Sequence, residues 1–262
     1  ECLGCDIKLP DEIKNRWFKW LSEIKESAKF QVNRYIFKEL KTIPSRSELT
    51  LHGFCDAGET AWGIAIYIRF YNPTNKSYQS CLIYSATRVA PTKGKLSIPR
   101  KELNAIVLVC EKLLYIAESL GIPINNIYAH TDSLVSIHWI SKNKNNLKLY
   151  VSNRVEKIQN SKIQIYFVPG KQNPADLVSK PKPSKEYINN TFWTSGPTFL
   201  QQDNNNWLEK YKMEVMIQDN LPDTEVNEYQ TEFRKIPEAN LFNSKITPET
   251  PSGVFGIMYR YN

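Results

Sequence analysis

The spacing of apolar side chains predicts two kinds of element in the first two-thirds of the chain. Apolar residues alternate with other residues from Trp62 to Phe70 and from Ile163 to Phe167, which is typical of strands. Shorter strands are predicted at residues 49–56, 78–86 and 127–131. Helical spacing is found at residues 10–40, 99–120 and 133–140, in a further helix ending near Ile158, and in a short helix that begins at Asn173.

The order of these elements along the chain predicts the fold class. The elements read β-β-β-α-β-α-α-β-α. Three consecutive strands form an antiparallel meander, and strands separated by helices pair in parallel. We therefore predict an α/β fold with a five-stranded mixed sheet flanked by helices.

The pattern changes on both sides of this block, which divides the chain into three regions. We expect residues 1–46 to be a helical connection and residues 47–182 to be the α/β domain. Residues 183–262 should be a C-terminal linker or tail, partly disordered, because its last part is rich in Asn, Asp, Glu and Pro. No apolar run is long enough to span a bilayer, so we expect no membrane partner.

The net charge of +7 indicates an anionic partner, with nucleic acid the first choice. Residues 1–202 hold 28 basic and 17 acidic residues, whereas residues 203–262 hold 6 basic and 10 acidic residues. The basic excess therefore lies in the folded block. Candidate contacts for a phosphate backbone lie before and at the start of the helix at 99–120, namely Arg88, Lys93, Lys95, Arg100 and Lys101.

Four carboxylates fall where the predicted elements meet one edge of the sheet. Asp56 ends the first strand and Asp132 ends the fourth, so both emerge at one edge if these strands are neighbours. Glu102 lies in the first turn of the long helix, on the face that packs on the sheet, and Asp176 lies in the last helix. Converging carboxylates repel unless a cation neutralises them, and oxygen ligands suit Mg²⁺ or Mn²⁺. Two such ions can promote hydrolysis of a phosphodiester.

Each of these carboxylates also has a plainer explanation. Asp132 could cap the next helix together with Ser133, and Asp56 could belong to a turn. Glu102 and Asp176 could complement the dipoles of the helices in which they lie. Position alone leaves the metal site and these plainer explanations open.

Six short blocks of sequence occur in an order that resembles one known family. The blocks are Leu51–Ala57, Thr87–Pro91 with Ile98–Leu103, Thr131–Ser133 with Trp139–Ile140, Asn153–Ile158, Val168–Leu177 and Trp193–Pro197. Together they resemble the ribonuclease H domain of BEL/Pao-type LTR retrotransposon polyproteins, a region often catalogued as Pao retrotransposon peptidase.

The resemblance implies a ribonuclease H-like fold and a specific activity. The chain would be a polyprotein fragment acting as a metal-dependent endoribonuclease, which cleaves the RNA strand of RNA–DNA hybrids during reverse transcription. Two Mg²⁺ (or Mn²⁺) ions would be held by Asp56, Glu102, Asp132 and Asp176. Residues 1–46 would connect to a reverse transcriptase domain of the same polyprotein. The location would be cytoplasmic, in a virus-like particle, or nuclear, and the protein would not be secreted.

The chain departs from the family pattern in its histidines. Many ribonucleases H have a histidine in the loop before the last aspartate, but the loop Gly170–Asn173 has none. The sequence therefore gives no support to a histidine-assisted product release. His130 stands where the family often has Trp, and we expect it to be structural, like His52 and His138.

Two other functions are weighed against the nuclease. The first is a catalytically inactive module that holds the hybrid or tethers the polymerase. The second is a Pao-type aspartic peptidase, which would need an Asp-Thr-Gly or Asp-Ser-Gly loop. This sequence contains no such loop, so we favour the peptidase least.

Overall fold

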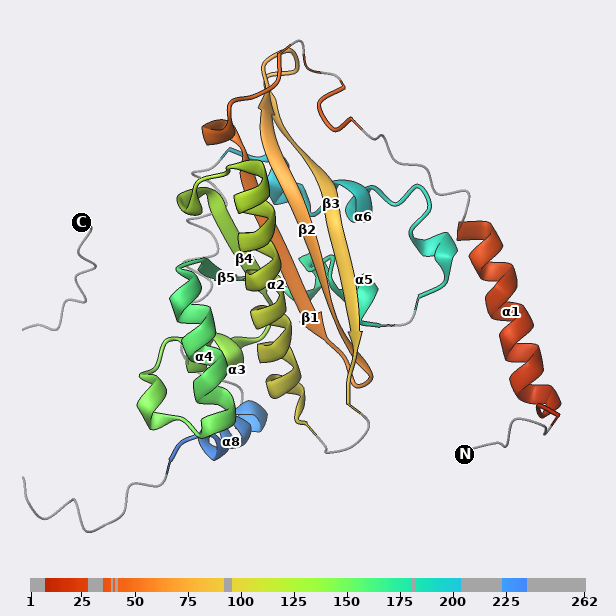
Figure 1. Ribbon diagram of the computed structural model, residues 1–262, viewed down its shortest axis with the longest axis vertical. Coiled ribbons are helices and arrows are strands. Elements are labelled where there is room, and N and C mark those ends of the chain that lie inside the picture. Colours follow the sequence, from red (N-terminus) through yellow and green to blue (C-terminus); the bar gives the residue numbers. More distant parts are fainter. Residues whose placement is uncertain are drawn as a thin grey trace, which may run out of the picture.

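A five-stranded mixed sheet lies at the centre of the computed structural model, in the order β3-β2-β1-β4-β5 (Figure 1). The structure describes residues 8–27, 35–38, 40, 42–91, 96–180, 182–203 and 223–234. The strands are β1 (Thr50–Ala57), β2 (Ala61–Asn72), β3 (Ser77–Val89), β4 (Ile127–Thr131) and β5 (Gln164–Phe167). The first three pair antiparallel, and β4 pairs in parallel with both β1 and β5. The predicted fold class is confirmed.

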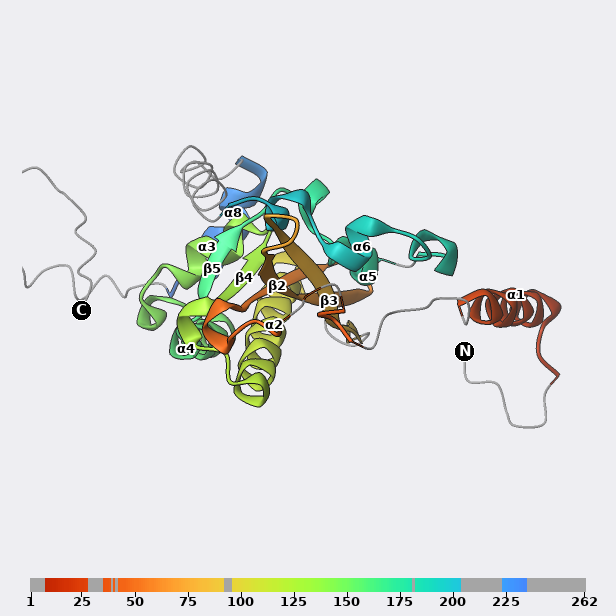
Figure 2. The same cartoon turned by 90° about the horizontal axis from the view of Figure 1, so that it is seen from above.

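Helices cover both faces of this sheet (Figures 1 and 2). They are α1 (Asp11–Ser27), α2 (Ile98–Leu120), α3 (Leu134–Ile140), α4 (Leu149–Ser161), α5 (Asp176–Ser179), α6 (Thr191–Ser195) and α8 (Asp223–Thr231). Helix α1 lies to one side of the sheet in both views. No helix of the described residues is both long enough and apolar enough to cross a membrane.

Helix α2 shows how local sequence sets its own limits. Ser97 stands in an extended conformation before it, and Pro99 lies in its first turn, where a missing N–H costs nothing. Gly121 ends it with φ +67°, and its N–H bonds the carbonyl oxygens of Ala117 and Glu118. Its apolar stripe packs on the sheet, and Leu103, Ile106, Val109 and Leu113 are fully buried.

The sheet separates two apolar cores. The larger core lies between the sheet and α2, α3 and α4, and it includes Leu51, Ile64 and Trp139. The smaller one lies on the opposite face, around Phe54 and Tyr67 of the central strands. A sheet of this kind needs a cover on both faces, because an exposed Phe54 or Tyr67 would leave apolar area in water.

The second face is covered by residues that we expected to form a linker. The residues are Trp193, Phe199 and Leu200, which pack on Phe54 and Tyr67. Tyr67 donates a hydrogen bond of 2.7 Å to the carbonyl oxygen of Trp193. The segment 184–202 therefore packs as part of the domain, because its apolar residues complete this core.

Buried Arg69 of β2 fixes the end of this covering segment. Its Nε donates to the carbonyl oxygen of Leu200 at 2.7 Å, and its Nη2 to that of Gln202 at 2.6 Å. Burial lowers the pKa of Arg69 to about 10, which still leaves it charged at neutral pH. The two carbonyl groups supply the partners that a buried guanidinium requires.

Gly63 makes room for the short helix α5. It is paired with Asp56 across β1 and β2, and a Cβ here would lie 2.7 Å from Cγ2 of Val178 and 2.9 Å from the backbone N of Ser179. We predict that Gly63→Ala lowers the free energy of unfolding by about 1–3 kcal/mol, measured by urea unfolding. Adding Val178→Ala should restore only part of this loss, because the contact with the Ser179 backbone remains. Full restoration would contradict the prediction.

The buried pair His52 and His130 predicts a loss of stability in acid. The two side chains are fully buried, with His52 Nδ1 and His130 Nε2 3.2 Å apart. Burial lowers the pKa of His130 to about 3 and that of His52 well below its ordinary value. Unfolded histidine titrates near pH 6.5, so below this pH the unfolded state binds protons that the folded state does not. Stability is fully present above pH 6.5 and falls toward pH 3, by about 2 kcal/mol per histidine at pH 5.

The variant His130→Phe tests this pH dependence. Urea unfolding at pH 7 and pH 5 should show a smaller loss for the variant than for the wild type, because one of the two histidines is gone. An equal loss in both proteins would assign the acid sensitivity to other groups.

Candidate active site at the edge of the sheet

The parallel pairing of β1 with β4 brings two of the predicted carboxylates to one edge. Cys55 of β1 is in register with Thr131 of β4, so Asp56 and Asp132 are the next residues on neighbouring strands. Asp56 is buried, with 6% of its surface exposed, and its Oδ2 accepts a hydrogen bond from Ser179 Oγ. Asp132 lies just beyond β4 and is half-buried.

Asp176 reaches the same edge from α5, of which it is the first residue. Its carboxylate forms an ion pair with the Nζ of Lys180, one helical turn later. The hydrogen bond to Asp176 raises the pKa of Lys180, and the charges of Asp56 and Asp132 act in the same direction. One ammonium group is therefore close enough to interact with all three aspartates.

The electrostatics of Asp132 reflect its burial and its closeness to the other two aspartates. Its pKa is raised to about 6, first by burial and then by the negative charge of Asp56, with Asp176 contributing less. A hydrogen bond of 3.3 Å from Asn173 Nδ2 acts in the opposite direction and does not cancel the increase. The three aspartates thus form a cluster whose negative charge is incompletely compensated.

Glu102 is connected to this cluster through Ser133. It lies in the first turns of α2, and its Oε2 accepts a hydrogen bond from Ser133 Oγ. Ser133 follows Asp132 directly and also caps α3, because its Oγ accepts from the N–H of Ser136 at 3.2 Å. The plainer explanation of a helix cap is therefore correct for Ser133, while Asp132 stays available to the cluster.

The cluster holds the right atoms for a hard divalent cation, although they are not arranged around one point. In the described part of the chain, no three His, Cys, Asp or Glu side chains are placed so that they could hold a metal ion. Ser133, Ser179 and Lys180 bind the carboxylates instead. The donors are all oxygen atoms, which Mg²⁺ and Mn²⁺ prefer, and a cation would relieve the repulsion that raises the pKa of Asp132. The donor set fits such an ion.

Asn173 is a site residue that the sequence did not indicate. Its side chain is buried, and its Nδ2 donates to the carbonyl oxygen of Cys55 at 2.9 Å as well as to Asp132. These two bonds hold the loop before α5 against the end of β1. The signal in the sequence was the run from Asn173 to Asp176, in which the asparagine precedes the last aspartate by three residues.

The predicted phosphate contacts have different environments. Arg88 is exposed at the end of β3. Arg100 forms an ion pair with Glu232, and buried Lys101 donates from its Nζ to the carbonyl oxygen of Glu59. Lys93 and Lys95 lie outside the described residues. Of the three described side chains, Arg88 is the one that is exposed and for which neither an ion pair nor a hydrogen bond is described.

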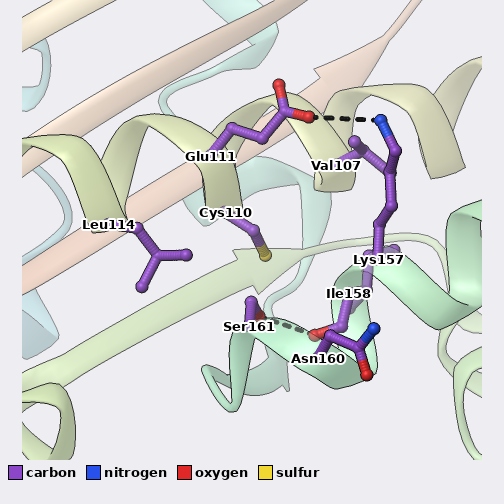
Figure 3. A pocket seen from close by; sticks show the side chains of 8 residues that line it. All are labelled: Val107, Cys110, Glu111, Leu114, Lys157, Ile158, Asn160 and Ser161. Atoms are coloured by element: carbon purple, nitrogen blue, oxygen red, sulfur yellow. Dashed lines mark hydrogen bonds and ion pairs between the residues drawn. The ribbon is translucent and has the colours of Figure 1, made fainter.

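A pocket of about 300 Å³ between α2 and α4 is a separate feature (Figure 3). It is lined by Val107, Leu114 and Ile158 with Cys110, and Lys157 and Glu111 form an ion pair of 3.6 Å beside it. Burial raises the pKa of the Cys110 thiol to about 12, which makes it a poor nucleophile. None of the four candidate carboxylates lines this pocket.

Comparison with solved structures finds several of the ribonuclease H type. The RNase H1 of the archaeon Halobacterium salinarum NRC-1 is 12% identical, with a TM-score of 0.33 over 50% of this chain and 92% of that one. LC11-RNase H1 isolated from compost, in complex with an RNA/DNA hybrid, is 13% identical, with a TM-score of 0.32 and coverages of 50% and 92%. A foamy viral protease-reverse transcriptase in complex with dsDNA is 18% identical, with a TM-score of 0.31 over 64% of this chain and 31% of that one.

The family itself is established by sequence. The comparison with curated proteins gave no match. Residues 3–133 match the model described as "Pao retrotransposon-like RNaseH-like domain", a stretch that contains Asp56, Glu102 and Asp132 and ends before Asp176. This match covers half of the chain, and the predicted five-stranded mixed sheet is present. The chain therefore belongs to the Pao retrotransposon-like RNaseH-like domain family.

Proposed function

We propose that this chain is a metal-dependent endoribonuclease that cleaves the RNA strand of RNA–DNA hybrids during reverse transcription of a retrotransposon. The observation that carries the proposal is the gathering of Asp56, Asp132 and Asp176 at one sheet edge, where burial and then the charge of Asp56 raise the pKa of Asp132. A carboxyl group whose pKa is raised by burial together with a specific neighbouring charge is a candidate for a functional site. Glu102 is the fourth member of the proposed set.

The residues of the chain hold these carboxylates in place. Asp56 is anchored on β1 by Ser179, and Asp132 is oriented by Asn173. Asp176 is held on α5 by Lys180. Two Mg²⁺ (or Mn²⁺) ions, when bound, would supply Lewis acidity for the attacking water and for the leaving oxygen.

The substrate and partners follow from the family and the chemistry. A hybrid is read by the shape of its backbone and by its 2′-hydroxyl groups, so we expect little preference for base sequence. Exposed Arg88 is a candidate phosphate contact, on position and charge. We also propose a reverse transcriptase domain of the same polyprotein as a partner, acting in the cytoplasm inside a virus-like particle or in the nucleus.

A second candidate function is an inactive module that binds the hybrid without cutting it. The contact between Lys180 and Asp176 favours this alternative, because an ammonium group already compensates one of the carboxylates. It predicts that the purified chain binds hybrid in the presence of Mg²⁺ and leaves its RNA strand intact.

The nuclease proposal predicts that single carboxylates are essential. With Mg²⁺ and a labelled RNA–DNA hybrid, Asp132→Asn or Glu102→Gln should lower the rate of RNA cleavage by at least about a hundredfold, which is about 2.7 kcal/mol of transition-state stabilisation. Gel analysis of the labelled RNA strand measures this rate.

Glu111→Gln is the matched control for this experiment. It removes a carboxylate from the same helix α2, at a position 57% exposed and paired only with Lys157 among the ion pairs described. Its rate should stay within about twofold of the wild type. Intact RNA with the wild-type chain, alone and linked to its reverse transcriptase, would refute the nuclease proposal.

The raised pKa of Asp132 predicts a second, thermodynamic effect. Its carboxyl has a pKa of about 6 in the fold against an ordinary value of 3.8, so the folded state holds a proton between these values. The stabilisation that this proton provides is present below pH 3.8 and is lost as the pH rises through 6. At pH 7 without metal, Asp132→Asn should therefore raise the free energy of unfolding by about 1–3 kcal/mol.

Thermal melting at pH 7 in EDTA and in Mg²⁺ measures this effect. Mg²⁺ should raise the Tm of the wild type and raise that of Asp132→Asn much less. An equal increase in both proteins would mean that the ion binds elsewhere.

A further inference from the structure

Glu232, from the last described segment of the chain, contacts Arg100 in the first turn of α2. The Nε and Nη2 of Arg100 lie 2.8 and 2.7 Å from one carboxylate oxygen, Oε1 of Glu232. Glu232 is 5% exposed, and its other oxygen, Oε2, is buried without a hydrogen-bond partner. A buried carboxylate with one oxygen unsatisfied is costly, so stability alone is a poor explanation of this contact.

Arg100 lies near the start of α2, beside Tyr150 of α4. It precedes Glu102 by two residues on the same helix end. Its guanidinium lies over the ring of Tyr150, with Cζ 4.9 Å from the ring centroid, and Arg154 stacks on that ring at 3.5 Å. Guanidinium groups bind phosphate and carboxylate with the same geometry. The Glu232 carboxylate thus shows where a phosphate oxygen can lie on Arg100.

The segment that carries Glu232, residues 223–234, is attached to the domain by hydrogen bonds and by aromatic packing. Tyr229 accepts a hydrogen bond of 3.3 Å at its carbonyl oxygen from Trp139 Nε1 of α3. Phe233 forms an isolated antiparallel bridge with Leu147, in the turn before α4. Helix α8 lies beside α3 (Figures 1 and 2). Backbone bonds from Lys148 to Glu232 and from Arg234 to Asn146 add to these contacts, and Tyr229 and Phe233 pack against the larger core. Release of the segment therefore gives up a defined set of contacts with α3 and with the turn before α4.

The charge of this segment resembles that of a nucleic acid. Residues 223–234 contain four acidic residues and one basic residue, whereas residues 1–202 carry a basic excess. The Glu232 carboxylate is favoured beside Arg100 and Arg154, and a phosphate group would be favoured there for the same reason.

We propose that Glu232 occupies the position of a nucleic-acid phosphate on Arg100, so that segment 223–234 and an RNA–DNA hybrid compete for one surface of the domain. The proposal rests on the proposed function only for the identity of the nucleic acid. Binding of the strand replaces Glu232 on Arg100 and releases the segment. Loosening the segment therefore strengthens binding of the hybrid.

Binding of a fluorescently labelled RNA–DNA hybrid to the full chain, followed by anisotropy in EDTA, tests the competition without any cleavage. Glu232→Gln should lower the Kd about three- to tenfold, because the binding-competent form becomes the major one. Phe233→Ala keeps the charge, weakens attachment of the segment, and should also lower the Kd.

Arg100→Gln should raise the Kd and reduce the salt dependence by about one phosphate contact.

Two controls separate competition from a general effect of charge. Glu156→Gln removes one negative charge from an ion pair with Lys144, and its Kd should stay within about twofold of the wild type. In the Arg100→Gln background, Glu232→Gln should have no further effect, because the shared contact is already gone. Circular dichroism shows whether each variant is folded, and Phe233→Ala decides the question if Glu232→Gln is not.

The outcomes also distinguish this proposal from the proposed function. If the wild type binds and cleaves hybrid while Glu232→Gln and Phe233→Ala leave the Kd unchanged or raise it, the competition is refuted and the nuclease stands. If neither the wild type nor these variants bind hybrid, both are refuted. Tighter binding by both variants with no cleavage by any of them supports the competition and favours the inactive binding module.

Discussion

The parallel pairing of β1 with β4 is the constraint on which the candidate site depends. It places Asp56 and Asp132 at the same edge of the sheet, where their mutual repulsion and their burial are unfavourable. The apolar packing of α2 on the sheet must supply the stability that holds these charges together, because the charges themselves oppose it. The candidate site therefore places unfavourable charges next to the apolar core that stabilises the fold.

The second face of the sheet imposes a similar requirement. Phe54 and Tyr67 need a cover, and the chain supplies one from residues that follow the last strand. On its way to that position the chain forms α5, whose Ser179 contacts Asp56 and whose Asp176 joins the cluster. The same stretch of chain therefore covers the smaller core and completes the candidate site. Gly63 permits the close approach of α5 to β2.

The sequence alone was sufficient to predict most of the sheet and to place Asp56 and Asp132 at the ends of two strands. Alternating apolar residues predict strands such as β2 directly, and strand ends are where Asp56 and Asp132 occur. Local patterns do not reveal contacts between distant residues. The burial of Lys101 against Glu59 and the ion pair of Arg100 with Glu232 arise from such contacts. The sequence alone therefore indicates only that Lys101 and Arg100 are basic residues near the start of a helix.

The segment 184–202 illustrates the same limit on a larger scale. It has little periodicity, because its contacts with the sheet come from single residues such as Trp193 and Leu200 in irregular turns. A search for apolar residues that repeat every two or 3.6 positions does not detect such single contacts. The role of Asn173 could not be predicted for a related reason. Its side chain bonds to Cys55 and Asp132, which are distant from it in sequence.

The ion pair between Lys180 and Asp176 has a consequence for any cation that enters this site. The ammonium already supplies positive charge to the aspartates, so binding of a divalent ion is an exchange of one cation for another. The free energy of that exchange is a difference between two attractive interactions with the same carboxylates. Such an exchange would cost part of the affinity for the ion, and the ammonium helps to hold the acidic edge together in the absence of an ion.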